Sequence, residues 1–429
     1  MTITGPLRVA LTSLGCKVNF AEMAELAGRL AAAGCDVVAE DQPADVRILN
    51  SCTVTLQADA TTRQRLSRLR RADPNAHIVL TGCSVDANPG AYATRQQLPG
   101  SPAAFVDAVF ANADKESIAE HVLHVTPTRS EPRELQPMRS RAFIKVQDGC
   151  NHRCTYCIVW QARGASRSVP QDLVVDRALA AVEAGQRELV LCGVDLGSYG
   201  RERSTTLAAL LERVLDAVGS HARVRLSSVN ANDVTPAMIE LNSHPRLCAH
   251  WHMPLQSGSD AVLRAMHRGY RRRQYLRVVE ALRNQKPETE CTTDVMVAFP
   301  GEDEDDHADT LSLLAEVGFL SCHVFRWSPR PGTPAAGADR RVDAATARRR
   351  SAEVRRLAAT TGRRCLERAV GRVHEVVWDS VDGVTARGLT SAYHHAEAPA
   401  DNRTRPGSLS RVHADSVDGD HLTVTVLDE

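Results

Sequence analysis

The 429-residue sequence has little lysine, few aromatic residues and no long apolar run. Only four lysines occur, Lys17, Lys115, Lys145 and Lys286, so arginine supplies 48 of the 52 basic residues. Aromatic residues make up 4% of the chain, and 52 acidic residues bring the formal net charge to zero. This balance gives no overall sign of a nucleic-acid or membrane partner. With 43% hydrophobic and 24% charged residues, the composition excludes a collagen-like or largely disordered chain.

Segments that direct a chain into membranes or out of the cell are also missing. No stretch reaches the length of about 18 apolar residues that a transmembrane helix needs, so no membrane partner is expected. Residues 1–15 lack a basic region followed by an apolar one, which predicts a cytoplasmic protein. Twelve cysteines are present. In a long chain without an export signal they are typical of metal binding or redox chemistry rather than of a disulfide framework.

Three regions of different texture predict an α/β fold. Residues 1–125 alternate apolar strands, expected at 8–14, 46–50 and 77–81, with helices, which predicts a doubly wound parallel sheet. Residues 126–141 hold three prolines among charged residues and are interpreted as a linker. Residues 142–360 continue the strand–helix pattern with six strands, which suits a partial or full (β/α) barrel. Short strands and turn residues over 363–429 predict a small all-β module.

The strongest motif is Cys150-Asn-His-Arg-Cys154-Thr-Tyr-Cys157, a C-x3-C-x2-C run just after the strand expected at 143–146. Three thiolates in so short a loop can converge on one metal centre. On a cubane cluster they leave one iron without a protein ligand, and an open position can bind a substrate. The alternative is a zinc site with His152 as the fourth ligand, although this residue lies between two of the cysteines and would strain such a shell.

A second set, Cys16, Cys52 and Cys83, is spread along the first region. Each cysteine follows one of the strands expected there, at spacings of 36 and 31 residues. Successive strands of a doubly wound sheet end at the same edge, so this pattern predicts a second three-thiolate site. Three independent core cysteines are the alternative. The other six show no common spacing and are assigned no role: Cys35, Cys192, Cys248, Cys291, Cys322 and Cys365.

Two cysteine sets in this order, with the motifs around them, resemble the radical S-adenosylmethionine (SAM) methylthiotransferases over nearly the whole chain. The matching motifs include Thr12-Ser-Leu-Gly-Cys16-Lys17-Val18-Asn19, Asn50-Ser51-Cys52-Thr53-Val54, Thr81-Gly82-Cys83, Leu191-Cys192-Gly193-Val194-Asp195, His252-Met253-Pro254-Leu255-Gln256-Ser257-Gly258 and Arg330-Pro331-Gly332-Thr333-Pro334. The resemblance implies a SAM-binding [4Fe-4S] cluster on Cys150, Cys154 and Cys157. It implies an auxiliary [4Fe-4S] cluster on Cys16, Cys52 and Cys83, and a C-terminal RNA-binding TRAM module.

The family adds a methylthio group to an unreactive C–H carbon, so the resemblance also implies a flavodoxin- or ferredoxin-type electron donor. Lys17-Val18-Asn19 and His323-Val324-Phe325 look most like the branch that modifies C2 of N6-threonylcarbamoyladenosine in tRNA anticodon loops. By the same resemblance, Tyr156 would pack near the SAM adenine and Gly193 would lie at the SAM site.

Further site candidates come from their position along the chain. Asp195, Ser228, Gln256 and Glu302 lie just past expected strands, where a barrel has its active site, although each could be an N-cap or loop residue. Arg163 and Arg167 could anchor the SAM carboxylate or a substrate phosphate, because a guanidinium binds either group bidentately. In an arginine-rich chain they could equally be ordinary surface residues.

Some features depart from the family pattern and leave the substrate open. The tract Ile158-Val159-Trp160-Gln161 lacks the usual proline, and Ala298 replaces a glycine. Over 363–429, eight arginines stand against eleven acidic residues, the wrong sign for phosphate binding. Basic residues gather instead at 264–273 and at 326–372, the latter with thirteen arginines and four acidic residues. The alternatives are methylthiolation of a protein or peptide natural product, a first domain that delivers electrons rather than sulfur, and a non-catalytic iron–sulfur or zinc RNA-binding protein.

Overall fold

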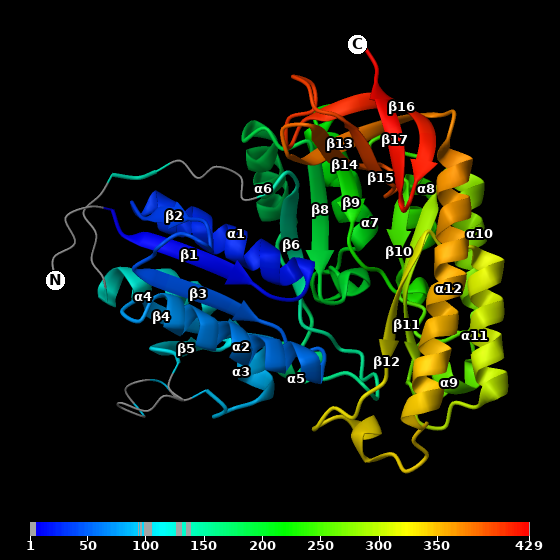
Figure 1. The fold of residues 1–429 in the computed structure, drawn as a ribbon, viewed down its shortest axis with the longest axis horizontal. Coiled ribbons are helices and arrows are strands. Elements are labelled where there is room, and N and C mark those ends of the chain that lie inside the picture. The colour runs from blue at the N-terminus through cyan, green and yellow to red at the C-terminus, as the bar shows by residue number, and fades with distance from the viewer. Residues whose placement is uncertain are drawn as a thin grey trace.

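The computed structural model describes residues 6–92, 94, 97, 105–125, 131–133 and 139–428. An N-terminal parallel-sheet domain, a central partial (β/α) barrel and a C-terminal five-stranded β-barrel follow one another along the chain (Figure 1). This architecture confirms the fold class expected from the sequence. Of the linker expected at 126–141, residues 126–130 and 134–138 lie outside the described residues.

The N-terminal domain is a sheet of five parallel strands in the order β2-β1-β3-β4-β5. Helices cover both of its faces, α1 and α4 on one side and α2 on the other, which is why its central strands are apolar throughout. The short β2 and β5 were not expected, because three residues carry too little periodicity to reveal a strand. The elements are β1 (Arg8–Ser13), α1 (Lys17–Ala32), β2 (Asp36–Val38), β3 (Val46–Ser51), α2 (Leu56–Ala72), β4 (His77–Gly82), α3 (Cys83–Ala87), β5 (Ala108–Phe110) and α4 (Ile118–Val125).

The central domain is an open barrel of six parallel strands. One sheet has the order β7-β6-β8-β9, with the two-residue β7 antiparallel to β6, and the other has the order β10-β11-β12. A bridge between Ser228 and His252 joins the two sheets, and β12 is an edge strand among the described strands. The strands are β6 (Ala142–Asp148), β7 (Arg167–Ser168), β8 (Glu188–Gly193), β9 (Arg223–Leu226), β10 (His250–His252), β11 (Glu290–Val297) and β12 (Ser321–Arg326).

Helices pack against the outer face of this barrel and enclose the largest hydrophobic core, which includes Leu191, Trp251 and Val295. Side chains alternate along a strand, so their neighbours point into the barrel. No described helix has the length and apolar composition needed to span a bilayer. The helices are α5 (Val159–Arg163), α6 (Gln171–Glu183), α7 (Leu207–Val218), α8 (Pro236–Leu241), α9 (Asp260–Ala265), α10 (Arg272–Gln285), α11 (Glu304–Val317) and α12 (Ala344–Ala369).

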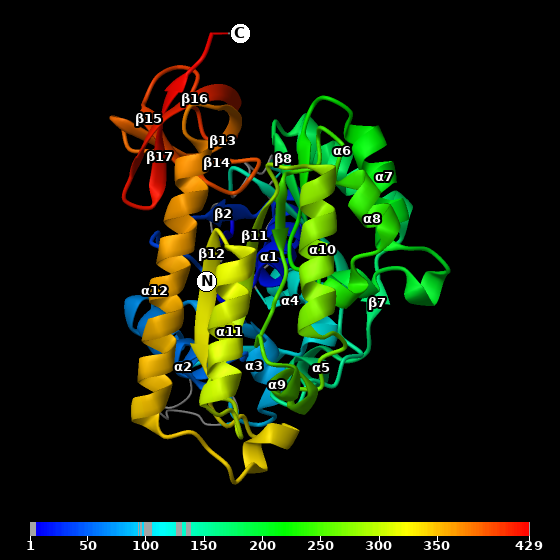
Figure 2. The same cartoon turned by 90° about the vertical axis from the view of Figure 1, so that its right-hand side faces the viewer.

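The C-terminal domain is a closed barrel in the order β13-β14-β15-β17-β16, attached to the end of α12 (Figure 2). The short strands expected from Arg363 onward begin only at Val373, because α12 continues to Ala369; its arginines and alanines have high helix propensity. Arg223 and Arg225 hold this barrel against the central domain by donating to the carbonyls of Leu389 and Thr390. The strands are β13 (Val373–Val381), β14 (Thr385–Thr390), β15 (His395–Pro399), β16 (Leu409–Asp418) and β17 (His421–Val426).

Candidate active site

Cys16, Cys52 and Cys83 each follow a strand of the N-terminal sheet and lie at its carboxyl edge. A Cβ atom on Gly15 would lie 2.7 Å from the Cβ of Cys52, so only glycine lets the Cys16 loop approach Cys52 this closely. Burial, with the nearby sulfurs of Cys16 and Cys83, raises the pKa of Cys52 to about 11. A thiol in this environment loses its proton only to a bound cation, which is the behaviour of a metal ligand.

Cys150, Cys154 and Cys157 lie in the loop between β6 and α5, and N–H donors face two of their sulfur atoms. The amide of Val159 lies 3.4 Å from Cys157 Sγ, and Arg268 Nη1 lies 3.5 Å from Cys154 Sγ. Burial raises the pKa of Cys150 to about 12 and that of Cys157 to about 11. Hydrogen bonds to sulfur stabilise thiolate ligands and set the potential of iron–sulfur clusters, so this donor set suits a cluster.

The spacing of the sulfur atoms distinguishes a cluster from a single ion. A tetrahedral zinc ion with Zn–S bonds of about 2.3 Å holds its sulfurs about 3.8 Å apart. Among the described residues, only His152, Asp195 and Asp233 bring three ligand atoms within 4.8 Å of one another, and neither cysteine set does so. His152 Nε2 lies 3.4 Å from Asp195, so its imidazole pairs with carboxylates rather than completing a zinc shell with the thiols. Both cysteine sets therefore fit a multi-iron cluster better than zinc.

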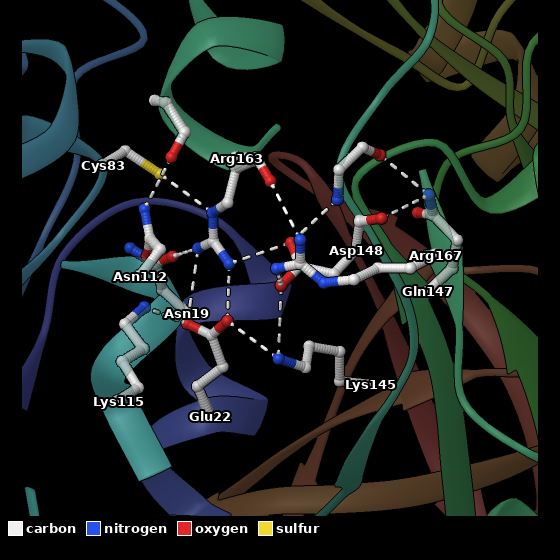
Figure 3. A network of polar contacts seen from close by, with 12 residues as sticks. Asn19, Glu22, Cys83, Asn112, Lys115, Lys145, Gln147, Asp148, Arg163 and Arg167 are labelled. Atoms are coloured by element: carbon white, nitrogen blue, oxygen red, sulfur yellow. Dashed lines mark hydrogen bonds and ion pairs between the residues drawn. The ribbon is translucent and has the colours of Figure 1, made fainter. Parts of the chain in front are cut away.

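Arg163 joins the two cysteine-bearing domains (Figure 3). It ends the helix that follows Cys157, and its Nε lies 3.1 Å from Cys83 Sγ on the N-terminal domain. Its Nη1 contacts Glu22 at 2.5 Å and Asp148 at 3.2 Å, and its Nη2 contacts Asn19 at 2.5 Å and Glu22 at 3.3 Å.

These contacts correct the interpretation of Arg163 as an anchor for SAM or phosphate. All five donors of its guanidinium face protein atoms, and the side chain is buried. Glu22 also accepts from Lys115 at 2.5 Å and from Lys145 at 3.1 Å, and these cations together hold its pKa well below the usual range against the opposing effect of burial. Arg163 therefore positions the two domains.

We expect Arg163→Met to lower the free energy of unfolding by about 3 kcal/mol, because it leaves Glu22 and Asp148 as buried carboxylates with one cation fewer. Urea denaturation followed by tryptophan fluorescence measures this change. Arg167→Met is the matched control: Arg167 pairs with the same Asp148 at 3.2 Å, but its side chain is 54% exposed. This control should cost no more than about 1 kcal/mol. Equal losses in the two variants would contradict the positioning role.

The remaining candidates gather at the carboxyl end of the barrel, beside the Cys150 loop. Gly193 and Asp195 follow β8, Ser228 follows β9 and Gln256 follows β10. Asp195 is buried and its amide donates to Gln147 Oε1 at 2.7 Å. A Cβ atom on Gly193 would lie 2.9 Å from the same oxygen, so the glycine keeps this crossing of two strands open. These residues line the side of the barrel on which radical SAM chemistry is expected.

Two other candidates take structural positions. Tyr156 packs against an apolar cluster that includes Phe299 and Trp327. Glu302 accepts from Arg350 at 2.6 Å and from the amide of Ala298 at 3.0 Å, which ties the end of β11 to α12. Ala298 itself has φ 61°, a conformation that glycine adopts without strain.

Arg268 was missed by sequence reasoning. Besides facing Cys154, it donates to Asn230 at 2.5 Å and to the hydroxyl of Tyr270 at 3.2 Å. In the sequence it is one of five arginines in the run 264–273, and nothing in the spacing marks it as the one that faces the cysteine loop. The six cysteines without an assigned role are free thiols, five of them buried and Cys322 half-buried.

Comparison with known proteins agrees with this arrangement. The description "Radical SAM superfamily" matches residues 144–314, and "Uncharacterized protein family UPF0004" matches residues 8–99. The chain is 36% identical to the threonylcarbamoyladenosine tRNA methylthiotransferase MtaB of Thermotoga maritima, over 90% of this chain and 89% of that protein. The corresponding protein of Chlamydia pneumoniae is 33% identical over 96% of both chains. The chain belongs to the radical SAM methylthiotransferase family.

Membership makes this methylthiotransferase an enzyme that uses SAM and a [4Fe-4S] cluster. A tRNA-2-methylthio-N(6)-dimethylallyladenosine synthase from a Parafrankia species is also similar, at 35% identity over 78% of this chain and 70% of that protein. Among solved structures, the radical SAM methyltransferase TsrM from Kitasatospora setae has a TM-score of 0.54 at 12% identity, covering 77% of this chain and 75% of its own. That likeness concerns the fold alone.

Proposed function

We propose that this methylthiotransferase modifies C2 of N6-threonylcarbamoyladenosine in the tRNA anticodon loop. The observation that carries the proposal is the pairing of two three-cysteine sites on facing domains, with Arg163 reaching from one domain to Cys83 of the other at 3.1 Å. The two MtaB relatives, which align over 90% and 96% of this chain, support the choice of nucleoside.

Cys150, Cys154 and Cys157 would hold the SAM-binding cluster, and Cys16, Cys52 and Cys83 a second [4Fe-4S] cluster. When bound, these groups supply the radical, sulfur and methyl chemistry of the reaction. The chain's own residues orient and enclose them: Val159 and Arg268 donate toward the sulfurs of the first set, and Arg163 toward the second. Asp195, Gly193, Ser228 and Gln256 form the barrel rim where SAM would bind. A small flavodoxin- or ferredoxin-type protein would supply electrons.

The outer face of α12 is the surface that suits the tRNA backbone. This helix runs along the side of the molecule (Figure 2), and Arg348, Arg355 and Arg356 are exposed on it. In the described residues, none of these three has a carboxylate partner within ion-pair distance. Unpaired arginines on one exposed face are free to bind phosphates, whereas the C-terminal barrel carries an excess of acidic residues.

We expect Arg348→Gln/Arg356→Gln to weaken tRNA binding and to reduce the slope of log affinity against log salt by up to about 2, one unit for each phosphate contact. Fluorescence anisotropy over a salt series measures both quantities. The control is Arg177→Gln/Arg213→Gln, which removes two arginines that pair with Glu25 and Asp172 on another part of the surface. A slope that changes equally in both variants would exclude α12 as the phosphate surface.

The proposed activity is tested with reconstituted protein, SAM, a reductant and anticodon stem-loops that differ only at the target adenosine. The stem-loop carrying N6-threonylcarbamoyladenosine should gain one CH2S unit by mass spectrometry. Preference for the dimethylallyladenosine stem-loop would move the chain to the other tRNA branch. Inactivity on both, with SAM still cleaved, would favour a protein or peptide substrate.

A further inference from the structure

A polar chamber inside the partial barrel holds side chains that the two cysteine sites do not use. Residues from all three domains contribute to it, and we call it the three-domain chamber. Lys17 comes from the N-terminal domain, His250, His252, Asp294 and His323 come from the barrel strands, and Tyr393 comes from the C-terminal barrel.

The barrel strands supply a hydrogen-bonded group of histidines. Asp294 lies 3.3 Å from Nε2 of His252 and 3.2 Å from Nδ1 of His323. The hydroxyl of Thr292 lies 2.8 Å from Nε2 of His250 and 2.9 Å from Nδ1 of His252. Because Asp294 contacts both imidazoles, it fixes their orientation. The His323 side chain is 68% exposed, so the chamber opens beside the edge strand β12.

Lys17 adds a positive charge that has no matching carboxylate. It is the first residue of α1, and its ammonium group lies 5.9 Å from the ring centroid of Tyr393. In contrast, Lys115 and Lys145 both pair with Glu22, and in the described part of the chain no carboxylate forms an ion pair with Lys17. A partly buried ammonium without a counter-ion is costly unless a ligand supplies one.

Neighbouring groups do not neutralise Lys17. Glu188 acts on it through space but is already bound by Arg223 at 2.6 Å and by Arg225 at 2.7 Å. Arg225 and Arg141 add further positive charge around it, and the charge of Lys17 reaches both His250 and His323. An anion entering past His323 would therefore meet a positive field at Lys17.

Tyr393 forms the floor of the chamber in a strained conformation. Its φ of 74° is unusual for an aromatic residue, and its ring stacks on His250 with a centroid distance of 4.1 Å and an interplanar angle of 11°. Residues held in this region of backbone space cluster at ligand sites, where surrounding contacts maintain them. The stacked ring is a flat, ordered surface beside the Lys17 ammonium.

We propose that Lys17 and His323 bind a carboxylate carried by the modified nucleoside, while Asp294 accepts from its hydroxyl or N–H donors. This inference rests on the proposed function, because a threonylcarbamoyl group has a carboxylate and a dimethylallyl group has none. Lys17 follows Cys16 directly, so a side chain held by Lys17 would keep the nucleoside beside the first-domain thiols. SAM also carries a carboxylate, and the test must separate these two sources.

The test measures binding of the reconstituted holoenzyme to two stem-loops, one with the natural threonyl carboxylate and one with that carboxylate converted to an amide. SAM is absent in this arm, and SAM affinity is measured separately. Wild-type protein should bind the carboxylate form about tenfold more tightly, the effect of one charge-assisted hydrogen bond. Lys17→Met and His323→Gln should remove most of this preference, and Lys17→Arg should keep it. Lys286→Met, which removes an ammonium that donates to the carbonyls of His244 and Leu247, is the matched control.

Each outcome decides a different point. If wild-type protein binds the two stem-loops equally well, or if both variants keep the preference, the carboxylate site is excluded while the proposed function stands. If the variants lose SAM affinity instead, the chamber binds the SAM carboxylate and the inference is wrong. If wild-type protein modifies neither stem-loop, the proposed function fails. His323→Gln keeps the test independent of the cluster, because it is far in sequence from every cysteine assigned to one.

Discussion

Cys150→Ala should abolish SAM cleavage while leaving the first-domain iron in place. The expected loss of 5′-deoxyadenosine formation is more than about 100-fold, since even outer-shell partners of a metal site change activity by about 10–100-fold. The reason is that Cys150 supplies one of only three thiols in its loop, so its removal leaves the cluster two protein ligands. Iron content should fall by about half, from about eight to about four irons per chain.

Cys291→Ala is the control for this variant, because Cys291 is buried on β11 and belongs to neither set. Its 5′-deoxyadenosine yield and iron content should match those of the wild type. If Cys150→Ala retained SAM cleavage, or lost all of its iron, the assignment of the two sets to separate clusters would be wrong. Zinc without acid-labile sulfide in the wild-type protein would support a non-catalytic zinc protein instead.

Cys16→Ala should have the opposite effect: SAM cleavage continues and methylthio product disappears. Cys16 is exposed at the carboxyl edge of the N-terminal sheet, where the open position of its site faces the central domain. We expect product formation to fall by more than about 100-fold on the same metal-ligand argument. Quantifying 5′-deoxyadenosine and methylthiolated nucleoside in one reaction measures this uncoupling.

Cys35→Ala provides the matched control in the same domain, because Cys35 lies in the apolar core beneath α1. Its two products should remain in the wild-type ratio. If Cys16→Ala still inserted sulfur normally, the first domain would have another role, and delivery of electrons to the Cys150 site would become the better interpretation.

The sequence predicted the sheet strands and both cysteine sets because these depend on local patterns. β1, β3 and β4 are continuous apolar runs followed at once by cysteine, and the C-x3-C-x2-C loop needs only eight residues to be recognised. α12 was partly misassigned, since an arginine-rich helix on the surface has little apolar periodicity to reveal where it ends.

Contacts between distant segments could not be predicted in the same way. Arg163 and Cys83 are 80 residues apart, and their contact exists only because α5 and α3 face each other across the domain boundary. Arg163 was therefore interpreted as a cofactor anchor rather than as the residue that joins the domains. Lys17 and Tyr393 are further apart still, and no spacing in the sequence brings them to the same chamber.

The most direct test of the whole account is mass spectrometry of tRNA nucleosides from a strain that lacks this gene. We predict that 2-methylthio-N6-threonylcarbamoyladenosine is lost, that its unmodified precursor accumulates, and that only the wild-type gene, not Cys150→Ala or Cys16→Ala, restores the product. An unchanged level of the methylthio nucleoside in the deletion strain would contradict the assignment.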